Sequence, residues 1–217
     1  MSSSPPVATG PDIVPAPPEP GSADEVAQQI DDIYAPLKRF RATFKQQYKA
    51  KIAGITKDST GVVIVVRPNK LSFRYDPPNN NRVVSDGNLI RVYEAENAQM
   101  FQQPLAATEY PGAFAFIMGK GLRPSFTFTF NDKAKWDGGP VIVGKPREPN
   151  PAYDSVLFYI DKALLMQKQP AAIRRVLVTD AQGNRNRFDF VEMSEPGEVS
   201  DDEFKFEPPP GTEIIKP

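Results

Sequence analysis

A dozen short segments in which apolar and polar residues alternate constrain the fold of this chain more than any other feature. In Leu71-Ser-Phe-Arg-Tyr75, for example, a strand would place the three apolar side chains on one side and the two polar ones on the other. The residues between such segments are turn formers, as in Asp76–Asn81 and Asp180–Asn184. Short turns join antiparallel strands, so we expect a mainly β fold made of hairpins and meanders.

This period-two alternation begins near residue 40 and continues almost to the end of the chain. It predicts strands at Ala42–Ile52, Thr60–Arg67, Leu71–Tyr75, Arg82–Ser85, Leu89–Glu94, Gln99–Gln103, Ser125–Asn131, Val141–Lys145, Ser155–Asp161, Ile173–Asp180, Arg187–Glu192 and Phe204–Glu207. Strands do not alternate with helices, so a parallel sheet is not expected.

Two helical segments accompany the predicted strands. Ser22 and Glu25 have the spacing at which each side chain caps the other's backbone N–H, and four apolar residues then recur at helical spacing from Val26 to Leu37. Pro36 should end this helix. Its polar face is acidic, which favours packing on the sheet over lying on a membrane surface. A second, short helix is expected within Pro111–Gly119, an apolar segment closed by glycine.

The first twenty residues contain seven prolines and almost nothing to bury. We therefore expect residues 1–21 to be a disordered, proline-rich leader, and residues 22–217 to form a single domain. A spacer that lifts the domain off a surface is the alternative for the leader.

Composition excludes several classes of function. The 217 residues include no histidine and no cysteine, which removes Ser-His-Asp and Cys-His catalysis and the common zinc and iron–sulfur sites. The net charge of -1 gives no basic field for nucleic acid. No pair of carboxylates lies in a motif typical of a glycosidase. We expect no enzyme activity, no metal and no cofactor.

Several motifs together have a familiar order and spacing. The chain resembles the LolA family of periplasmic outer-membrane lipoprotein carrier proteins from about Asp24 to Ile215. The resemblance rests on Leu37-Lys-Arg-Phe-Arg-Ala-Thr-Phe-Lys-Gln46, Arg67-Pro-Asn69, Phe73, Pro77-Pro78, Val84-Ser-Asp-Gly87, Val92-Tyr93, Asp180-Ala-Gln-Gly-Asn184 and Phe204-Lys-Phe-Glu-Pro-Pro-Pro-Gly211.

The resemblance implies an unclosed antiparallel β-barrel of about eleven strands with a helical lid. It also implies a monomeric periplasmic carrier that takes lipoproteins from an inner-membrane ABC transporter. Such a carrier shields their acyl chains in an apolar cavity and passes them to an outer-membrane lipoprotein receptor. The first residues lack the charged-then-apolar pattern of an export signal, so we expect that signal to lie outside this sequence.

The resemblance also assigns site residues. Arg67 occupies the position of the family's lid-latch arginine, which hydrogen-bonds lid carbonyls in the closed state. On the residues alone, Arg67 is better explained as a charge at the end of a strand, and ordinary core packing is the alternative for the apolar residues; the resemblance reverses the preference for Arg67. The residues predicted to bind lipid are Val63, Val65, Leu71, Phe73, Tyr93, Phe114, Phe116, Ile117 and Met118.

Two other functions on the same scaffold stay open at this point. An outer-membrane lipoprotein receptor would carry a lipidated N-terminal cysteine, and this sequence contains no cysteine. A periplasmic glycolipid-binding or sensor protein is the other alternative. The long leader and the proline-rich connection Gly138–Pro151 also leave open a tethered or lineage-specific variant of the carrier.

Overall fold

The structure is a computed structural model that describes residues 15–105, 115–150 and 153–216. Helical segments within this part are α1 (Ala23–Tyr34), α2 (Ala115–Met118), α3 (Lys162–Met166), η3 (Pro170–Ala172) and η4 (Asp201–Phe204). The strands are β1 (Arg39–Ala50), β2 (Ile55–Val66), β3 (Lys70–Tyr75), β4 (Arg82–Asp86), β5 (Leu89–Glu94), β6 (Gln99–Pro104), β7 (Phe126–Phe130), β8 (Val141–Pro146), β9 (Ser155–Ile160), β10 (Ile173–Thr179), β11 (Arg185–Ser194) and β12 (Glu213–Ile215).

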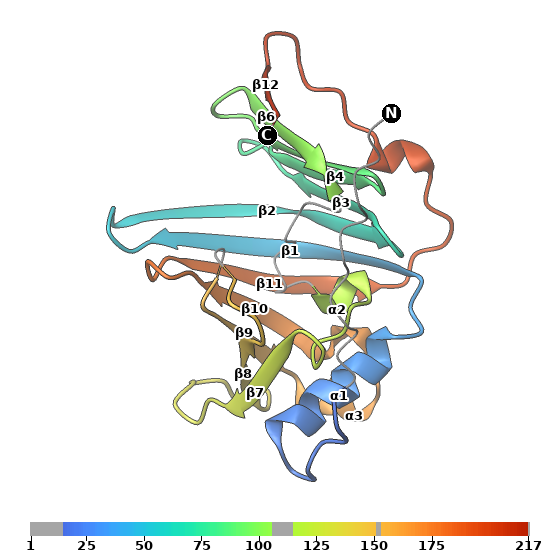
Figure 1. Cartoon of the computed structure of the whole chain (residues 1–217), viewed down its shortest axis with the longest axis vertical. Helices are drawn as coiled ribbons and strands as arrows, with labels where there is room; N and C mark the ends of the chain where they lie inside the picture. The colour runs from blue at the N-terminus through green and yellow to red at the C-terminus, as the bar shows by residue number, and fades with distance from the viewer. Residues whose placement is uncertain (1–14, 106–114, 151–152, 217) are drawn as a thin grey trace, which may run out of the picture.

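These strands form one 12-stranded sheet in the order β12-β6-β5-β4-β3-β2-β1-β11-β10-β9-β8-β7. Ten of the eleven pairs of neighbouring strands are antiparallel, and β12 pairs with β6 in parallel. The sheet curves into a half-barrel whose ends, β12 and β7, stay apart (Figure 1). The expected unclosed β-barrel is therefore confirmed.

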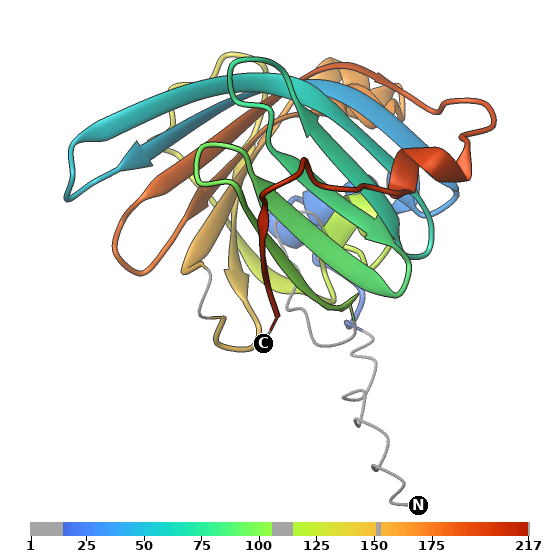
Figure 2. The same ribbon diagram turned by 90° about the horizontal axis from the view of Figure 1, so that it is seen from above.

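Helices α1 and α2 lie inside the curve of the sheet (Figure 2). As the sequence predicts, the Ser22 side chain caps α1 by accepting a hydrogen bond from Glu25 N–H at 3.1 Å, and the helix ends before Pro36. The Glu25 carboxylate accepts from Gly21 N–H at 2.6 Å, one residue earlier than the reciprocal cap requires. The apolar stripe of α1 faces the sheet, with Ala27 and Ile30 fully buried. We call α1 and α2 the helical lid.

The second half of β2, Val62–Val66, is apolar on both faces, and both faces of the sheet are covered there. Val63 and Val65 belong to the large core between the sheet and the helical lid. Ile64 belongs to a second cluster on the convex face, together with Val84 and Phe204. A continuous apolar run is what a strand buried on both sides requires.

Residues 199–206, which we call the C-terminal strap, cover the convex face at this place. The prediction of a strand at Phe204–Glu207 is wrong, because Phe204 ends the short helix η4 and its ring is buried against the sheet. Alternation here marks a segment that lies across the sheet and does not pair with it. The sequence analysis also missed α3, η3 and the parallel strand β12.

The division into a leader and a domain at residue 21 stays a prediction. The carbonyl of Ala16 accepts a hydrogen bond from the buried guanidinium of Arg123, so part of the predicted leader contacts the domain. In the part of the chain that the structure describes, no helix is long and apolar enough to cross a membrane.

Candidate functional site

The concave side of the sheet is lined by aromatic and branched aliphatic side chains. Phe44 on β1 lies at the centre, with its ring centroid 5.6 Å from Phe73, 5.2 Å from Tyr75 and 5.7 Å from Phe188. Tyr75 is partly buried at the edge of this cluster, and burial raises the pKa of its phenol to about 12. We call this aromatic and aliphatic lining of β1, β2, β3 and β11 the concave wall.

Most of the residues predicted to bind lipid lie together here. Val63, Val65, Leu71 and Phe73 are buried in the concave wall, as the alternation of β2 and β3 predicts. Ile117 of α2 is buried against the same cluster, and Met118 packs beside it partly exposed. The structure thus brings wall and lid residues into one apolar layer.

The prediction that Tyr93 lines the cavity is wrong, because the strand register places its side chain on the other face of the sheet. It stands opposite Arg82 across β4 and β5, and its ring centroid is 5.3 Å from that of Phe206 in the C-terminal strap. Tyr93 therefore faces the convex side. Phe114 lies outside the described residues, and so does the side chain of Phe116.

Arg67, immediately after β2, joins the sheet to both helices of the lid. Its Nε donates a hydrogen bond to the carbonyl of Ile117 in α2 at 3.0 Å. Its Nη1 donates to the carbonyls of Tyr34 and Ala35, at the end of α1, at 2.6 and 3.2 Å. One planar guanidinium with several fixed donors can reach two helices at once, which an ammonium cannot do as well.

The carbonyls that Arg67 contacts need a partner for a physical reason. The last carbonyls of a helix have no intrahelical donor, and the helix dipole places partial negative charge there. The Tyr34 carbonyl accepts from Leu37 N–H at 3.1 Å, and the Arg67 guanidinium adds a charged donor to it and to the Ala35 carbonyl. Half-burial lowers the pKa of the Arg67 guanidinium, but arginine remains charged at physiological pH.

Gly119, just after α2, makes room for this guanidinium. A Cβ added at Gly119 would lie 2.9 Å from Nε and 3.1 Å from Cζ of Arg67, and the residue has a φ of +86°. Both the space and the backbone conformation exclude larger residues. The glycine that closes the short apolar segment thus serves the Arg67 contact.

A second set of contacts binds the lid helices to each other. The Asp31 carboxylate of α1 accepts hydrogen bonds from the backbone N–H groups of Leu122 and Arg123, at 2.5 and 3.0 Å. Arg123 in turn donates to the Gln28 side chain at 2.6 Å. Burial raises the pKa of Asp31, an effect that these N–H donors oppose. Helix α1 and the segment after α2 are therefore tied independently of Arg67.

Sequence reasoning missed several residues of this site. Phe44 and Phe188 lie in the concave wall but were not assigned to it, although the alternation of Phe188 and Phe190 around Asp189 carries the signal. The Asp31 contact leaves no local signal, because its partners are backbone groups 91 and 92 residues away.

Within the described residues, no group of three or more acidic side chains is placed to hold a metal ion. The described residues of the concave wall are mainly aromatic and aliphatic, a surface chemistry that suits contact with hydrocarbon.

Comparison with known proteins agrees with this geometry. The family model described as outer membrane lipoprotein carrier protein LolA matches residues 35–207. The chain belongs to the LolA family. An outer-membrane lipoprotein carrier protein from Bordetella pertussis is 27% identical over 199 residues, which cover 91% of this chain and 89% of the relative. Another from Methylibium petroleiphilum is 27% identical over 183 residues, covering 83% and 84%.

The fold also occurs in solved structures. A conserved protein from Thermus thermophilus, described as uncharacterized, superposes with a TM-score of 0.51 at 13% identity, covering 90% of this chain and 99% of the other. At this level of identity, the comparison shows a shared fold and carries no information on function.

Proposed function

We propose that this LolA-family protein is a periplasmic carrier that shields the acyl chains of lipoproteins against the concave wall. The observation that carries the proposal is the Arg67 contact, in which one side chain on the sheet holds both helices over an apolar surface. Each methylene kept from water contributes about 0.8 kcal/mol of favourable free energy, so burying an acyl chain against this wall favours cargo binding.

In this proposal the helical lid covers the concave wall when no cargo is bound. Ile117 is buried against the same cluster as Val63 and Phe73, so the lid occupies surface that an acyl chain would contact. Loading requires the lid to move, and the Arg67 hydrogen bonds must then break. The bonds stabilise the empty state and so weaken cargo binding, which favours release to a receptor.

The relatives of this chain support the class of cargo. Proteins that match along most of this chain are outer-membrane lipoprotein carriers. We infer that the partners are an inner-membrane ABC transporter that supplies lipoproteins and an outer-membrane receptor that accepts them. We further infer that the carrier acts as a monomer and catalyses no reaction.

The test is the replacement of Arg67 by leucine. Charge-assisted hydrogen bonds contribute roughly 1.5–3 kcal/mol, so losing them should tighten binding of a triacylated lipopeptide by about ten- to a hundredfold. Transfer of bound lipoprotein to receptor-containing membranes should slow by a similar factor. Arg67→Lys should lie between, because it keeps the charge and loses the fork.

Arg91→Leu is the matched control. It removes an arginine whose 2.8 Å ion pair with Asp86 lies in the β4–β5 turn, away from the lid. Its lipopeptide affinity should equal that of the unaltered protein. If folded Arg67→Leu instead loses lipopeptide binding, Arg67 holds cargo and the proposed release mechanism is wrong.

A further inference from the structure

Strand β2 extends well beyond its neighbour β3. The pairing of β2 with β1 begins at Ile55, whereas its pairing with β3 begins only at Gly61, opposite Tyr75. Residues 55–60 therefore have a partner strand on one side only. On the side that faces away from β1, these residues form a local open edge, although β2 is a central strand of the sheet.

The direction of the backbone groups on this edge follows from two hydrogen bonds. Arg67 N–H donates to the Lys38 carbonyl at 3.0 Å, which places odd-numbered residues of β2 in hydrogen-bonded pairs with β1. The Thr60 carbonyl accepts from Asp76 N–H at 2.9 Å, on the opposite side. Because bonding alternates along an antiparallel pair, the N–H and C=O groups of Thr56 and Asp58 point away from β1.

Those outward groups have no backbone partner among the residues that the structure describes. An exposed row of alternating donors and acceptors is a template for one more strand.

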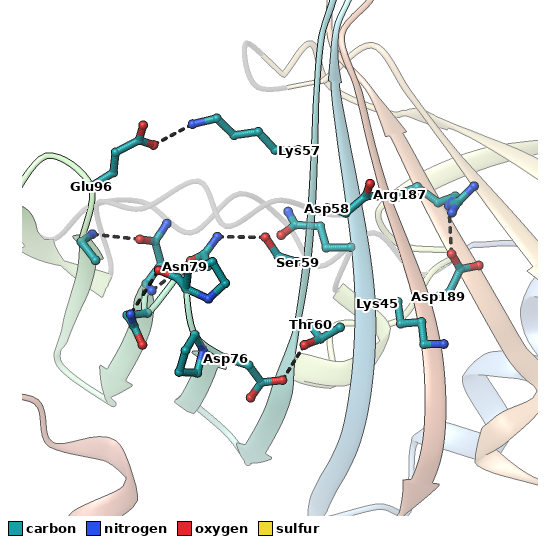
Figure 3. Close-up of a pocket in the computed structure, with 16 residues that line it drawn as sticks. Lys45, Lys57, Asp58, Ser59, Thr60, Asp76, Asn79, Glu96, Arg187 and Asp189 are labelled. Carbon is teal, nitrogen blue, oxygen red and sulfur yellow. Dashed lines mark hydrogen bonds and ion pairs between the residues drawn. The ribbon is translucent and has the colours of Figure 1, made fainter.

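A pocket of about 980 Å³ lies along this edge (Figure 3). Its far wall is the loop after β3, where Asn79 donates a hydrogen bond to the Ser59 hydroxyl at 2.9 Å. Glu96 closes another side through its 2.6 Å ion pair with Lys57. The pocket lies within the size range of sites that bind small molecules or peptide segments.

Polar groups of both signs line the pocket. Besides the paired Lys57 and Glu96, Arg187 pairs with Asp189 at 2.8 Å. The remaining lining consists of Lys45, Asp58 and Asp76 together with amides, hydroxyls, prolines and Ala95, so charges of the two signs nearly balance. Such a surface suits an uncharged polar backbone better than a strongly charged ligand.

The edge begins where the concave wall ends. A Cβ at Gly61 would lie 2.8 Å from the Phe44 ring, so the central aromatic residue of the wall touches the last paired residue of β2. An acylated protein changes from apolar to polar in the same order, since its hydrocarbon chains are followed directly by polypeptide. One cargo could therefore place acyl chains on the wall and its first residues on the edge.

We propose that Thr56–Thr60 binds, by strand addition, the extended polypeptide that follows the lipidated end of an acylated cargo protein. The inference rests on the proposed carrier function and adds a second, polar subsite to it. Main-chain hydrogen bonds would recognise any extended segment whatever its sequence, which suits a carrier of many cargoes.

The test compares two ligands on the full chain. One is a synthetic triacylated peptide with a ten-residue linker of serine, threonine and asparagine. The other carries the same lipid on a dipeptide. We expect the linker to tighten binding about tenfold, as a few main-chain hydrogen bonds can do. Hydrogen exchange at the amides of Thr56 and Asp58 should slow with the long ligand and not with the short one.

Asp58→Pro removes the outward N–H without touching the pairing with β1, because proline is tolerated on a strand edge. It should abolish the benefit of the linker and leave the short ligand's affinity unchanged. Asp58→Ala is the matched control, since it loses the same carboxylate, with its 2.9 Å bond from Gln47, and keeps the N–H. It should keep the tenfold benefit.

The outcomes separate this inference from the carrier function. If neither ligand binds, the carrier function fails. If both bind equally and the two amides exchange as before, the carrier function stands and the edge subsite is overturned. Concentration-dependent protection without ligand, with a doubled mass in solution, would assign the edge to a second copy of this chain and overturn the inference as well.

Discussion

The two faces of strand β2 are both apolar and both covered in its second half, Val62–Val66, but the covers are held in different ways. On the concave face the helical lid is held to the sheet by Arg67, whose partners are neutral carbonyls at the ends of helices. On the convex face the C-terminal strap is held by a buried ring, Phe204, and by the carboxylate of Glu203. The lid contact joins one cation to neutral carbonyls, whereas the strap contact joins a carboxylate to a buried hydroxyl and two arginines.

The Glu203 side chain shows why the strap is permanent. It accepts a hydrogen bond from the Ser72 hydroxyl at 2.6 Å and lies 3.4 Å from Nε of Arg74. Arg82 approaches the same carboxylate at 3.9 Å and also stacks on Phe206. Lifting the strap would break these charge-assisted contacts and expose the buried Phe204 ring to water, which is costly. Together with the proposed carrier function, these contacts lead us to propose that one cover stays fixed and the other moves.

The largest expected effect is that of Phe204→Ala. The ring is 1% exposed, so its removal leaves a cavity on the convex face and should lower the free energy of unfolding by about 3–5 kcal/mol. Denaturant unfolding measures this loss. Lipopeptide affinity of the folded variant should not change. A loss no larger than that of Phe101→Ala, whose ring is 40% exposed, would show that the strap is not fixed.

Arg67→Leu should cost stability only in the empty protein. Unfolding without ligand should become easier by roughly 1.5–3 kcal/mol, because the hydrogen bonds to the lid are lost. With saturating lipopeptide the variant and the unaltered protein should differ by much less, since the bonds are then already broken. Thermal unfolding with and without ligand measures both. An equal loss in the two conditions would place Arg67 in the permanent structure.

Glu203→Ala gives the opposite pattern. It unpairs Ser72 and Arg82 under the strap and should lower the free energy of unfolding by about 1–3 kcal/mol. That loss should be the same with and without lipopeptide, because the convex face takes no part in binding. The same pair of thermal unfolding experiments measures it. A ligand-dependent loss would mean that the two faces of β2 are coupled.

The smallest expected effect is that of pH on the β4–β5 turn, beside the strap. Partial burial opposes ionisation of Asp86, but hydrogen bonds from Leu89 N–H and from Arg91 outweigh it and lower the pKa from 3.8 to about 2. A lowered pKa stabilises the fold above pH 3.8, and this contribution is lost as pH falls toward 2. The thermal midpoints of the unaltered protein and Asp86→Asn should therefore differ at pH 5 and converge at pH 2. A constant difference would contradict the assignment.

Much of the fold could be predicted from the sequence, but the C-terminal strap could not, for a physical reason. The alternation along Leu71–Tyr75 fixes which residues share a face, and Ser22 with Pro36 sets the ends of α1 within a few residues. Alternation does not say whether a segment pairs with a sheet or lies across it, so Phe204–Glu207 was misassigned.

The face of Tyr93 could not be predicted for a related reason. Which side of a sheet a strand residue occupies depends on the register across each turn, and register is a property of pairing and not of local sequence. The Arg67 contact was predicted through the family resemblance, because its partners lie 32 to 50 residues away. The edge at Thr56–Thr60 depends on β3 being shorter than β2, which only the structure shows.

The central claim is that the helical lid leaves the concave wall when cargo binds. The chain has no cysteine, so two can be introduced for spin labels without interference. Lys120, next to α2, and Asn88, in the β4–β5 turn, are both exposed and suit this purpose. Pulsed electron–electron double resonance should give one distance between the two labels in the empty protein and a longer one with bound triacylated lipopeptide. Adding Arg67→Leu should shift the empty protein part of the way toward the longer distance. A single, unchanged distance with lipopeptide demonstrably bound would contradict the account.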